Sequence, residues 1–303
     1  SSVLDYSVEG KEEEAQFDAA LAMTLKTIEF AKERHAIPFA VFKPTGLGRL
    51  DLYEKVGSKT VLTSSEKEEW DRVVDRFDLV CKTAHYKDVA LLIDAEESWM
   101  QDAADDLVTQ MMQKYNKEKA VVFNTLQMYR WDRLDYLKQL HEKAKQNGFF
   151  IGMKIVRGAY MEKENARAIE KGYPTPICAS KEATDKNYDA AVLYMVEHIE
   201  TMAIFAGTHN ELSSYTLMNL MQERGIKTND DRIWFGQLYG MSDNISYNLA
   251  AHRYNVAKYL PFGPVKDVMP YLIRRAEENT SVAGQTSREL LMIKAERSRR
   301  KSS

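Results

Sequence analysis

The feature that most constrains the fold of this chain is a series of eight short apolar runs, which recur about every 36 residues between longer polar and amphipathic stretches. Each run has the length and apolar content of a buried parallel strand. The eight runs are Val3–Val8, Pro38–Phe42, Val89–Ile93, Ala120–Phe123, Ile151–Val156, Met202–Ala206, Arg232–Phe235 and Asn255–Leu260. Because the spacing leaves room for a helix in each crossover, the sequence predicts eight βα units.

The stretches between the runs carry helical periodicity. In Asp102–Tyr115, the residues Leu107, Met111 and Met112 recur at the spacing of one helix face. In Glu12–Glu33 the residues that share a face are Phe17, Ala20, Leu21, Thr24 and Leu25. Helices of this kind are the covers that both faces of a parallel sheet need.

Eight parallel strands with helical crossovers form either a closed barrel or an open, doubly wound sheet, and periodicity alone leaves both possible. The count of eight, the length of 303 residues and the absence of a Gly-x-Gly-x-x-Gly motif after the first run favour the barrel. No linker rich in Pro, Gly or Ser divides the chain. We therefore expect an α/β fold, a (βα)8 TIM-like barrel, as a single catalytic domain over residues 1–303.

Composition and charge exclude several classes of protein. With 44% hydrophobic and 29% charged residues the chain is globular, and a net charge of −3 gives no footprint for nucleic acid. The basic cluster at Arg297–Lys301 is read as a solvated helix end. Cys81 and Cys178 are too few and too far apart for a disulfide scaffold or a structural zinc site, and a reducing compartment follows. The sequence contains no run long and apolar enough to span a membrane, and residues 1–5 have no features of a signal peptide.

Polar residues gather directly after the apolar runs. In a parallel barrel the functional face is built where the strands end, so these segments are the candidates for a site. They are Lys43–Gly46, Asp94–Glu97, Asn124–Gln127, Arg157–Tyr160, Gly207–Asn210, Gly236–Gly240 and Tyr259–Gly263. Any one of them alone reads as a polar loop with a turn residue, whereas seven together favour a functional face.

Each candidate also has a structural interpretation. Asp94, Glu96 and Glu97 suit a hard cation, but no second acidic cluster follows another strand, so a carboxylate near Lys43 is the better use. A lone histidine such as His209 is more often structural than catalytic. Glycine and alanine after Arg157 are either turn residues or a place where a flat ligand or pyrophosphate approaches the backbone.

The segment after the eighth run places two arginines side by side. If Asp267 caps a helix, Tyr271, Arg274, Arg275 and Glu278 share one of its faces. The alternative is a solvated face with an i,i+4 ion pair. A helix at this point of a barrel lies over its mouth, where two guanidinium groups suit a carboxylate or phosphate. Together with the lysine after the second run, they imply a small anionic substrate.

Five motifs in the same order resemble the proline dehydrogenase family. They are Ile93–Ser98, Val156–Tyr160, Thr208–Asn210, Phe235–Met241 and Tyr271–Asn279. The resemblance extends from Asp5 in the first run to the last helix, and Phe42–Gly46 and Phe123–Thr125 look more like the stand-alone, mitochondrial-type or bacterial monofunctional enzymes than the bifunctional ones. The helical arm that the family has before the first strand is absent here, so we expect a trimmed form of the protein.

The resemblance implies a distorted (βα)8 barrel with its last helix over the mouth. It also implies a noncovalent FAD, oxidation of L-proline to Δ1-pyrroline-5-carboxylate by hydride transfer to flavin N5, and electron transfer to a membrane quinone. The expected compartment is the bacterial cytoplasm at the membrane periphery or, in a eukaryote, the mitochondrial inner membrane or matrix.

The same resemblance assigns residues by position. The catalytic pocket falls on Lys43, Asp94, Tyr259, Tyr271, Arg274 and Arg275, with the lysine and arginines on the proline carboxylate and Asp94 paired with the lysine. The positions that contact FAD or line its pocket are Ala95, Gln127, Lys154, Val156, Gly158, Ala159, Tyr160, Lys181, Thr208, His209, Asn210, Gln237 and Glu278. No metal is expected.

Two other functions are compatible with a barrel of this kind. A metal-dependent aldolase or hydrolase acting on a small anionic substrate would use Asp94, Glu96 and His209. A binding scaffold that has lost its activity would carry broken motifs, whereas the motifs here are intact. Flavin absorbance of the purified chain separates the first alternative from proline oxidation.

Overall fold

A computed structural model describes residues 1–266, 268–269, 272–273 and 293–300. The chain divides into two compact units, Ser1–Pro261 and Phe262–Ser303. The first unit contains nearly all of a closed barrel. In the second, the described residues 293–300 are helical.

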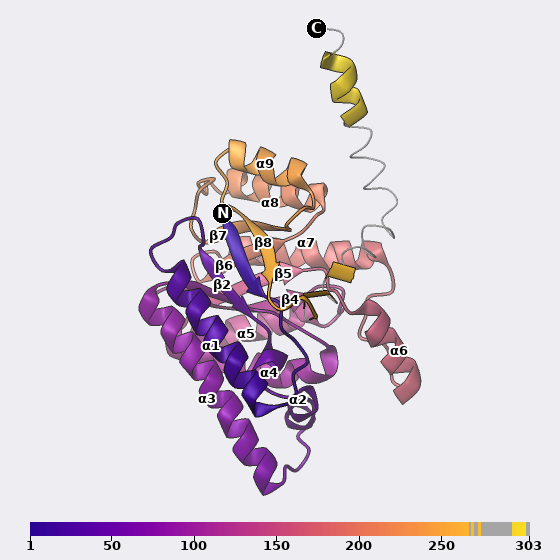
Figure 1. Cartoon of the computed structure of the whole chain (residues 1–303). Helices are drawn as coiled ribbons and strands as arrows, with labels where there is room; N and C mark the ends of the chain where they lie inside the picture. The colour runs from indigo at the N-terminus through magenta and orange to yellow at the C-terminus, as the bar shows by residue number, and fades with distance from the viewer. Residues whose placement is uncertain (267, 270–271, 274–292, 301–303) are drawn as a thin grey trace. The chain divides into compact units, whose positions relative to one another are not determined.

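Eight parallel strands form a closed barrel in sequence order (Figure 1). They are β1 (Ser2–Tyr6), β2 (Phe39–Phe42), β3 (Ala90–Ile93), β4 (Val122–Gln127), β5 (Ile151–Val156), β6 (Met202–Gly207), β7 (Ile233–Leu238) and β8 (Val256–Phe262). Where β8 returns to β1, the backbone N–H of Lys258 donates to the carbonyl of Ser1 at 2.9 Å. The structure therefore confirms the predicted barrel and rejects the open sheet.

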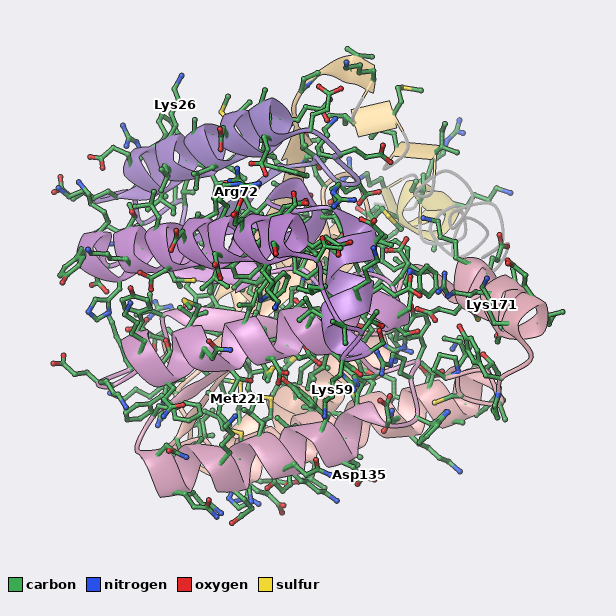
Figure 2. All side chains as sticks on the ribbon, turned by 90° about the horizontal axis from the view of Figure 1, so that it is seen from below. Lys26, Lys59, Arg72, Asp135, Lys171 and Met221 are labelled. Carbon is green, nitrogen blue, oxygen red and sulfur yellow. The ribbon has the colours of Figure 1, made fainter. Side chains whose placement is uncertain are left out.

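Helices connect successive strands. They are α1 (Glu14–Ala31), η1 (Pro44–Gly46), α2 (Leu50–Gly57), α3 (Ser64–Lys87), α4 (Ser98–Tyr115), α5 (Arg133–Asn147), α6 (Met161–Lys171), α7 (Lys181–Glu197), α8 (Glu211–Glu223) and α9 (Asp243–Ala251). Two crossovers carry more than the single helix that even spacing predicts: η1 and α2 precede α3, and α6 precedes α7. In both views α6 projects outward from the helices around the barrel (Figures 1 and 2).

Aromatic side chains fill the inside of the barrel. The ring of Phe39 makes edge contacts with Phe123, Phe205 and Trp234, at centroid distances of 5.7, 5.1 and 5.3 Å. Gly152 on β5 makes this packing possible, because a Cβ there would lie 2.6 Å from the ring of Phe123. The interior is thus a packed apolar floor, as expected for a barrel of eight strands.

A second, larger apolar core lies between the barrel and its helices. Ion pairs tie the helices together outside it, and Figure 2 shows Arg72 of α3 beside α1. Its guanidinium pairs with Glu14 at 2.8 Å, and the buried Arg76 reaches Asp18 at 2.9 Å. Among the described residues, no helix combines the length and the apolar character needed to cross a membrane.

Candidate active site

A layer of charged side chains stands on the apolar floor of the barrel. Alternate residues of a strand point the same way, so Lys43 and Asp94 continue the inward rows of Val41 on β2 and Leu92 on β3. Asp5 on β1 lies two residues beyond an interior valine in the same manner. The inward rows of β1, β2 and β3 therefore change from apolar to charged toward the carboxyl ends of these strands.

Five of these side chains contact one another. The Nζ of Lys43 lies 3.0 Å from Oδ2 of Asp94 and 3.3 Å from both carboxylate oxygens of Asp5. The Nζ of Lys154 bonds to Oδ1 of Asp94 and donates to the hydroxyl of Tyr259 at 3.1 Å. These residues come from β1, β5 and β8 and from the ends of β2 and β3. We call them the charged layer.

The charged layer is buried, and its positive and negative charges balance. Burial by itself raises the pKa of Asp94, but the charges of Lys154 and Lys43 outweigh it and hold that pKa below its ordinary value. For Lys43, burial lowers the pKa, and the charges of Asp5 and Asp94 outweigh that effect and raise it. Two lysines and two aspartates carry formal charges that cancel, so an arriving anion needs a further cation.

A second buried carboxyl joins the loops after β2 and β3. The backbone N–H and hydroxyl of Thr45 donate to Glu96 at 2.9 and 2.5 Å. The backbone N–H of Glu96 donates to Gln101 at 3.0 Å, and its carbonyl accepts from Nε2 of Gln127 at 2.7 Å. Glu96 therefore connects three successive strand ends.

The pKa of Glu96 is shifted in the opposite direction to that of Asp94. Burial and the neighbouring charge of Glu97 raise its pKa to about 8, although the two bonds from Thr45 act in the other direction. At neutral pH the neutral carboxyl form therefore predominates. The hydroxyl of Thr45 also accepts a bond from the N–H of Gly10 at 2.9 Å, which ties in the loop after β1.

The loop after β5 brings bare backbone to the barrel mouth. Gly158 has a φ of +131°, and a Cβ there would lie 2.5 Å from the ring of Tyr129. The N–H of Ala159 donates to Oε1 of Gln127 at 3.3 Å. Only glycine adopts this backbone angle without strain and also leaves room for the ring of Tyr129. The loop conformation therefore requires glycine at position 158.

Arg157 fixes the same loop from the other side. Its guanidinium donates to Asp185 at 2.6 Å, to the hydroxyl of Thr208 at 2.8 Å and to Ser213 at 3.0 Å. It also lies over the ring of Tyr188, with Cζ 4.5 Å from the centroid. One side chain thus joins β5 to the loop after β6 and to α7 and α8.

The loops after β6 and β7 carry the remaining polar candidates. Asn210 caps α8 by accepting from Ser213, and His209 Nδ1 lies 3.0 Å from the hydroxyl of Ser242. Gln237 donates to the carbonyl of Thr208 at 3.2 Å and accepts from a serine hydroxyl of α9 at 2.9 Å. These side chains are held in place by neighbours from adjacent loops.

The structure gathers most of the predicted site residues at one end of the barrel. Lys43, Asp94, Lys154 and Tyr259 meet in the charged layer. The other predicted residues at strand ends or in the loops that follow are Ala95, Gln127, Val156, Gly158, Ala159, Tyr160, Thr208, His209, Asn210 and Gln237. Lys181 is instead the first residue of α7, where it is 73% exposed and pairs with Asp185.

Four predicted residues lie outside the described part of the chain, namely Tyr271, Arg274, Arg275 and Glu278, and only residues 268–269 and 272–273 of the helix expected over the mouth are described. Sequence reasoning missed Asp5 and Tyr129. An aspartate inside the first apolar run was the available signal for Asp5. Within the described residues, no group of three His, Cys, Asp or Glu side chains is arranged to hold a metal ion. Asp94, Glu96 and His209, the metal alternative, each have separate partners.

Comparison with known proteins identifies the relatives of the chain. The sequence model of the proline dehydrogenase family matches residues 1–288. Carbapenem antibiotics biosynthesis protein CarD of Pectobacterium carotovorum subsp. carotovorum is 38% identical over 98% of this chain and 77% of its own length. Mitochondrial proline dehydrogenase 1 of Homo sapiens is 39% identical over 78% of this chain.

The chain spans only part of several relatives. It covers 40% of the human enzyme and 30% of proline utilization A (PutA) from Bdellovibrio bacteriovorus, whose structure was solved after inactivation by N-propargylglycine. That structure superposes with a TM-score of 0.81 over 93% of this chain, at 22% identity, and so shares the barrel fold. By the match over residues 1–288, the chain belongs to the proline dehydrogenase family of oxidoreductases.

Proposed function

We propose that this chain oxidises L-proline to Δ1-pyrroline-5-carboxylate with a noncovalent FAD. The observation that carries the proposal is the charged layer, in which Lys43 and Lys154 share the buried carboxylate of Asp94 at the carboxyl ends of the strands. Family membership supplies the reaction class. The charged layer supplies a place where a small zwitterion finds both signs of charge within a few ångströms.

The loops around the charged layer have the properties that a flavin requires. Gly158 and Ala159 are the small residues of the loop after β5, and small residues let a flat ring or a pyrophosphate approach the backbone closely, on the side away from the Tyr129 ring that packs against Gly158. Gln127 and Gln237 each donate an amide N–H to a backbone carbonyl, and each –NH2 group carries a second N–H. When bound, FAD supplies the two-electron acceptor, which no side chain of the chain provides.

The protein groups then bind and orient the substrate. Lys43 together with Arg274 and Arg275 is proposed to hold the proline carboxylate, and the arginines supply the positive charge that the balanced layer lacks. Tyr259, only 7% exposed and fixed by its bond to Lys154, is proposed to pack against the pyrrolidine ring. The proline nitrogen must be unprotonated to react, so the rate is expected to rise with pH until that amine has lost its proton.

The remaining partners follow from the same proposal. We propose a membrane quinone as the electron acceptor, reached by peripheral contact with a membrane. The relatives include mitochondrial enzymes of eukaryotes and a bacterial protein. The proposed compartment is accordingly the bacterial cytoplasm or the mitochondrial matrix and inner membrane.

Absorbance of the purified chain tests the proposal directly. We expect the visible absorbance bands of a flavin in the isolated protein or after addition of FAD. Proline added in the absence of oxygen should bleach these bands. A folded chain that stays colourless with added FAD would refute it. Activity that is lost in EDTA and restored by a divalent metal would instead support the aldolase or hydrolase alternative.

A further inference from the structure

Helix α6 is attached to the barrel by polar contacts. Of its eleven residues, only Glu164 and Ala168 are buried. Its last residue, Lys171, lies far out on the projecting end of the helix (Figure 2). A helix that buries so little apolar surface gains little from the hydrophobic effect, so specific polar contacts must hold it in position.

Three side chains of α6 reach the start of α4, and one of them, Arg167, also pairs with Glu54 of α2. Lys163 Nζ lies 2.8 Å from Oε1 of Glu97, and the carboxylate of Glu164 accepts from the N–H of Ser98 at 2.6 Å and from its hydroxyl at 2.5 Å. Arg167 stacks over Trp99 at 4.4 Å. Residues 97–99 form the beginning of α4, so α6 is docked on the N-terminus of that helix.

Glu164 supplies the cap that α4 lacks. The N-cap residue of α4, Glu97, makes no side-chain capping bond, because its carboxylate pairs with Lys163. The fully buried Glu164 carboxylate accepts the free N–H of the first turn, where the helix dipole favours a negative charge. One side chain of α6 therefore completes α4 and fixes α6 at the same time.

This joint lies between the two loops that carry the candidate site. The chain runs from Gly158 through Ala159 into Tyr160, the N-cap of α6, whose carbonyl accepts from the N–H of Glu164 at 2.9 Å. On the other side, α4 follows directly after the loop that contains Asp94 and Ala95. A displacement of Glu164 would thus move the backbone after β5 relative to the backbone after β3.

We propose that Glu164 is a positioning residue, which braces the loop after β5 against the loop after β3 so that both hold the cofactor in one geometry. The inference rests on the proposed flavin function. Gln127 makes a parallel brace, since it bonds to the carbonyl of Glu96 and to the N–H of Ala159. Loss of Glu164 therefore loosens the site without abolishing it.

Titration of the purified full chain, stripped of flavin, with FAD tests the brace. Glu164→Ala and Glu164→Gln are compared with Glu162→Ala and Glu162→Gln, matched changes at an exposed residue of the same helix. We expect the Glu164 variants to bind FAD about tenfold more weakly, which is less than the full effect of losing a charge-assisted contact because the Gln127 brace remains. We also expect an altered visible circular dichroism of the bound flavin. The Glu162 variants should match the wild type.

Ser98→Ala keeps the experiment decisive if the Glu164 variants do not fold. It removes one of the two bonds to Glu164, and we expect a smaller loss of FAD affinity in the same direction. Equal affinity and equal flavin spectra in folded Glu164 or Ser98 variants, even with a lowered Tm, would make Glu164 purely structural and overturn the inference. Failure of the wild type to bind FAD would instead refute the proposed function.

Discussion

Removal of the Asp94 charge should cost stability and proline binding together. In the structure this carboxylate lies 3.0 Å from the Nζ of Lys43 and also bonds to Lys154, while its own side chain is 13% exposed. In Asp94→Asn, Lys43 keeps Asp5 as a partner, whereas Lys154 keeps, among the described residues, only the hydroxyl of Tyr259. A buried charge left without its counter-ion typically costs about 3–5 kcal/mol, and we expect a loss of that order.

Urea denaturation at pH 7 measures this cost. We expect the transition midpoint to fall in Asp94→Asn with an unchanged m-value, and KM for proline to rise because Lys43 loses its orientation. Asp135→Asn is the matched control, an exposed aspartate near the start of α5 (Figure 2), and should change stability by less than about 0.5 kcal/mol. Equal stability of the Asp94 variant and the control would refute the role of the charged layer.

The pH dependence provides an independent check on Asp94. The pKa of this carboxyl is held below its ordinary value of 3.8 in the folded state. The unfolded chain therefore takes up the proton first, and the stabilisation is complete above that ordinary value and disappears as the pH falls through the folded-state pKa. The stability difference between the wild type and Asp94→Asn should accordingly shrink on acidification below about pH 4.

The remaining predictions concern the anion site, the second buried acid and the glycine loop. Arg274→Ala or Arg275→Ala should raise KM for proline about 10- to 150-fold with little change in FAD content, and unchanged KM in both would remove the carboxylate assignment. Burial raises the pKa of Glu96 to about 8, above its ordinary 4.5, so the folded state holds a proton that the unfolded chain releases. Wild-type stability should therefore fall between about pH 5 and pH 8 relative to Glu96→Gln, and parallel curves would contradict this. Gly158→Ala should cost about 1–3 kcal/mol and lower the FAD content, because it adds a clash to an unfavourable φ. Gly172→Ala, with a positive φ but open space, should cost only about 1 kcal/mol, and equal effects in both variants would show that the clash has no role.

Local sequence patterns predicted the barrel and the end of it at which the polar candidate residues gather. Period and burial are local properties, so eight apolar runs at even spacing were enough to predict strands and helical crossovers, whereas closure was favoured by the count of eight, the chain length and the absence of a Gly-x-Gly-x-x-Gly motif after the first run. The polar residues that follow them were correctly placed at the strand ends, because a parallel sheet turns every carboxyl end toward one side. Even spacing did not predict how many helices each crossover contains. It therefore gave no sign of α6, whose docking depends on a contact between Glu164 and the distant Ser98.

Only the tertiary structure determined which of these side chains meet. The pairing of Asp94 with Lys43 joins the ends of neighbouring strands and followed from the family resemblance. The contacts of Lys154 with Asp94 and with Tyr259, by contrast, cross the barrel interior. Such contacts depend on strand tilt and on the closure of β8 against β1, neither of which any single segment encodes. The parallel pairing of β1 with β2 brings Asp5 to Lys43 across 38 positions of sequence. The sequence by itself thus determined the strands, their order and their polar ends, and the three-dimensional packing decided the partners and pKa of each charge.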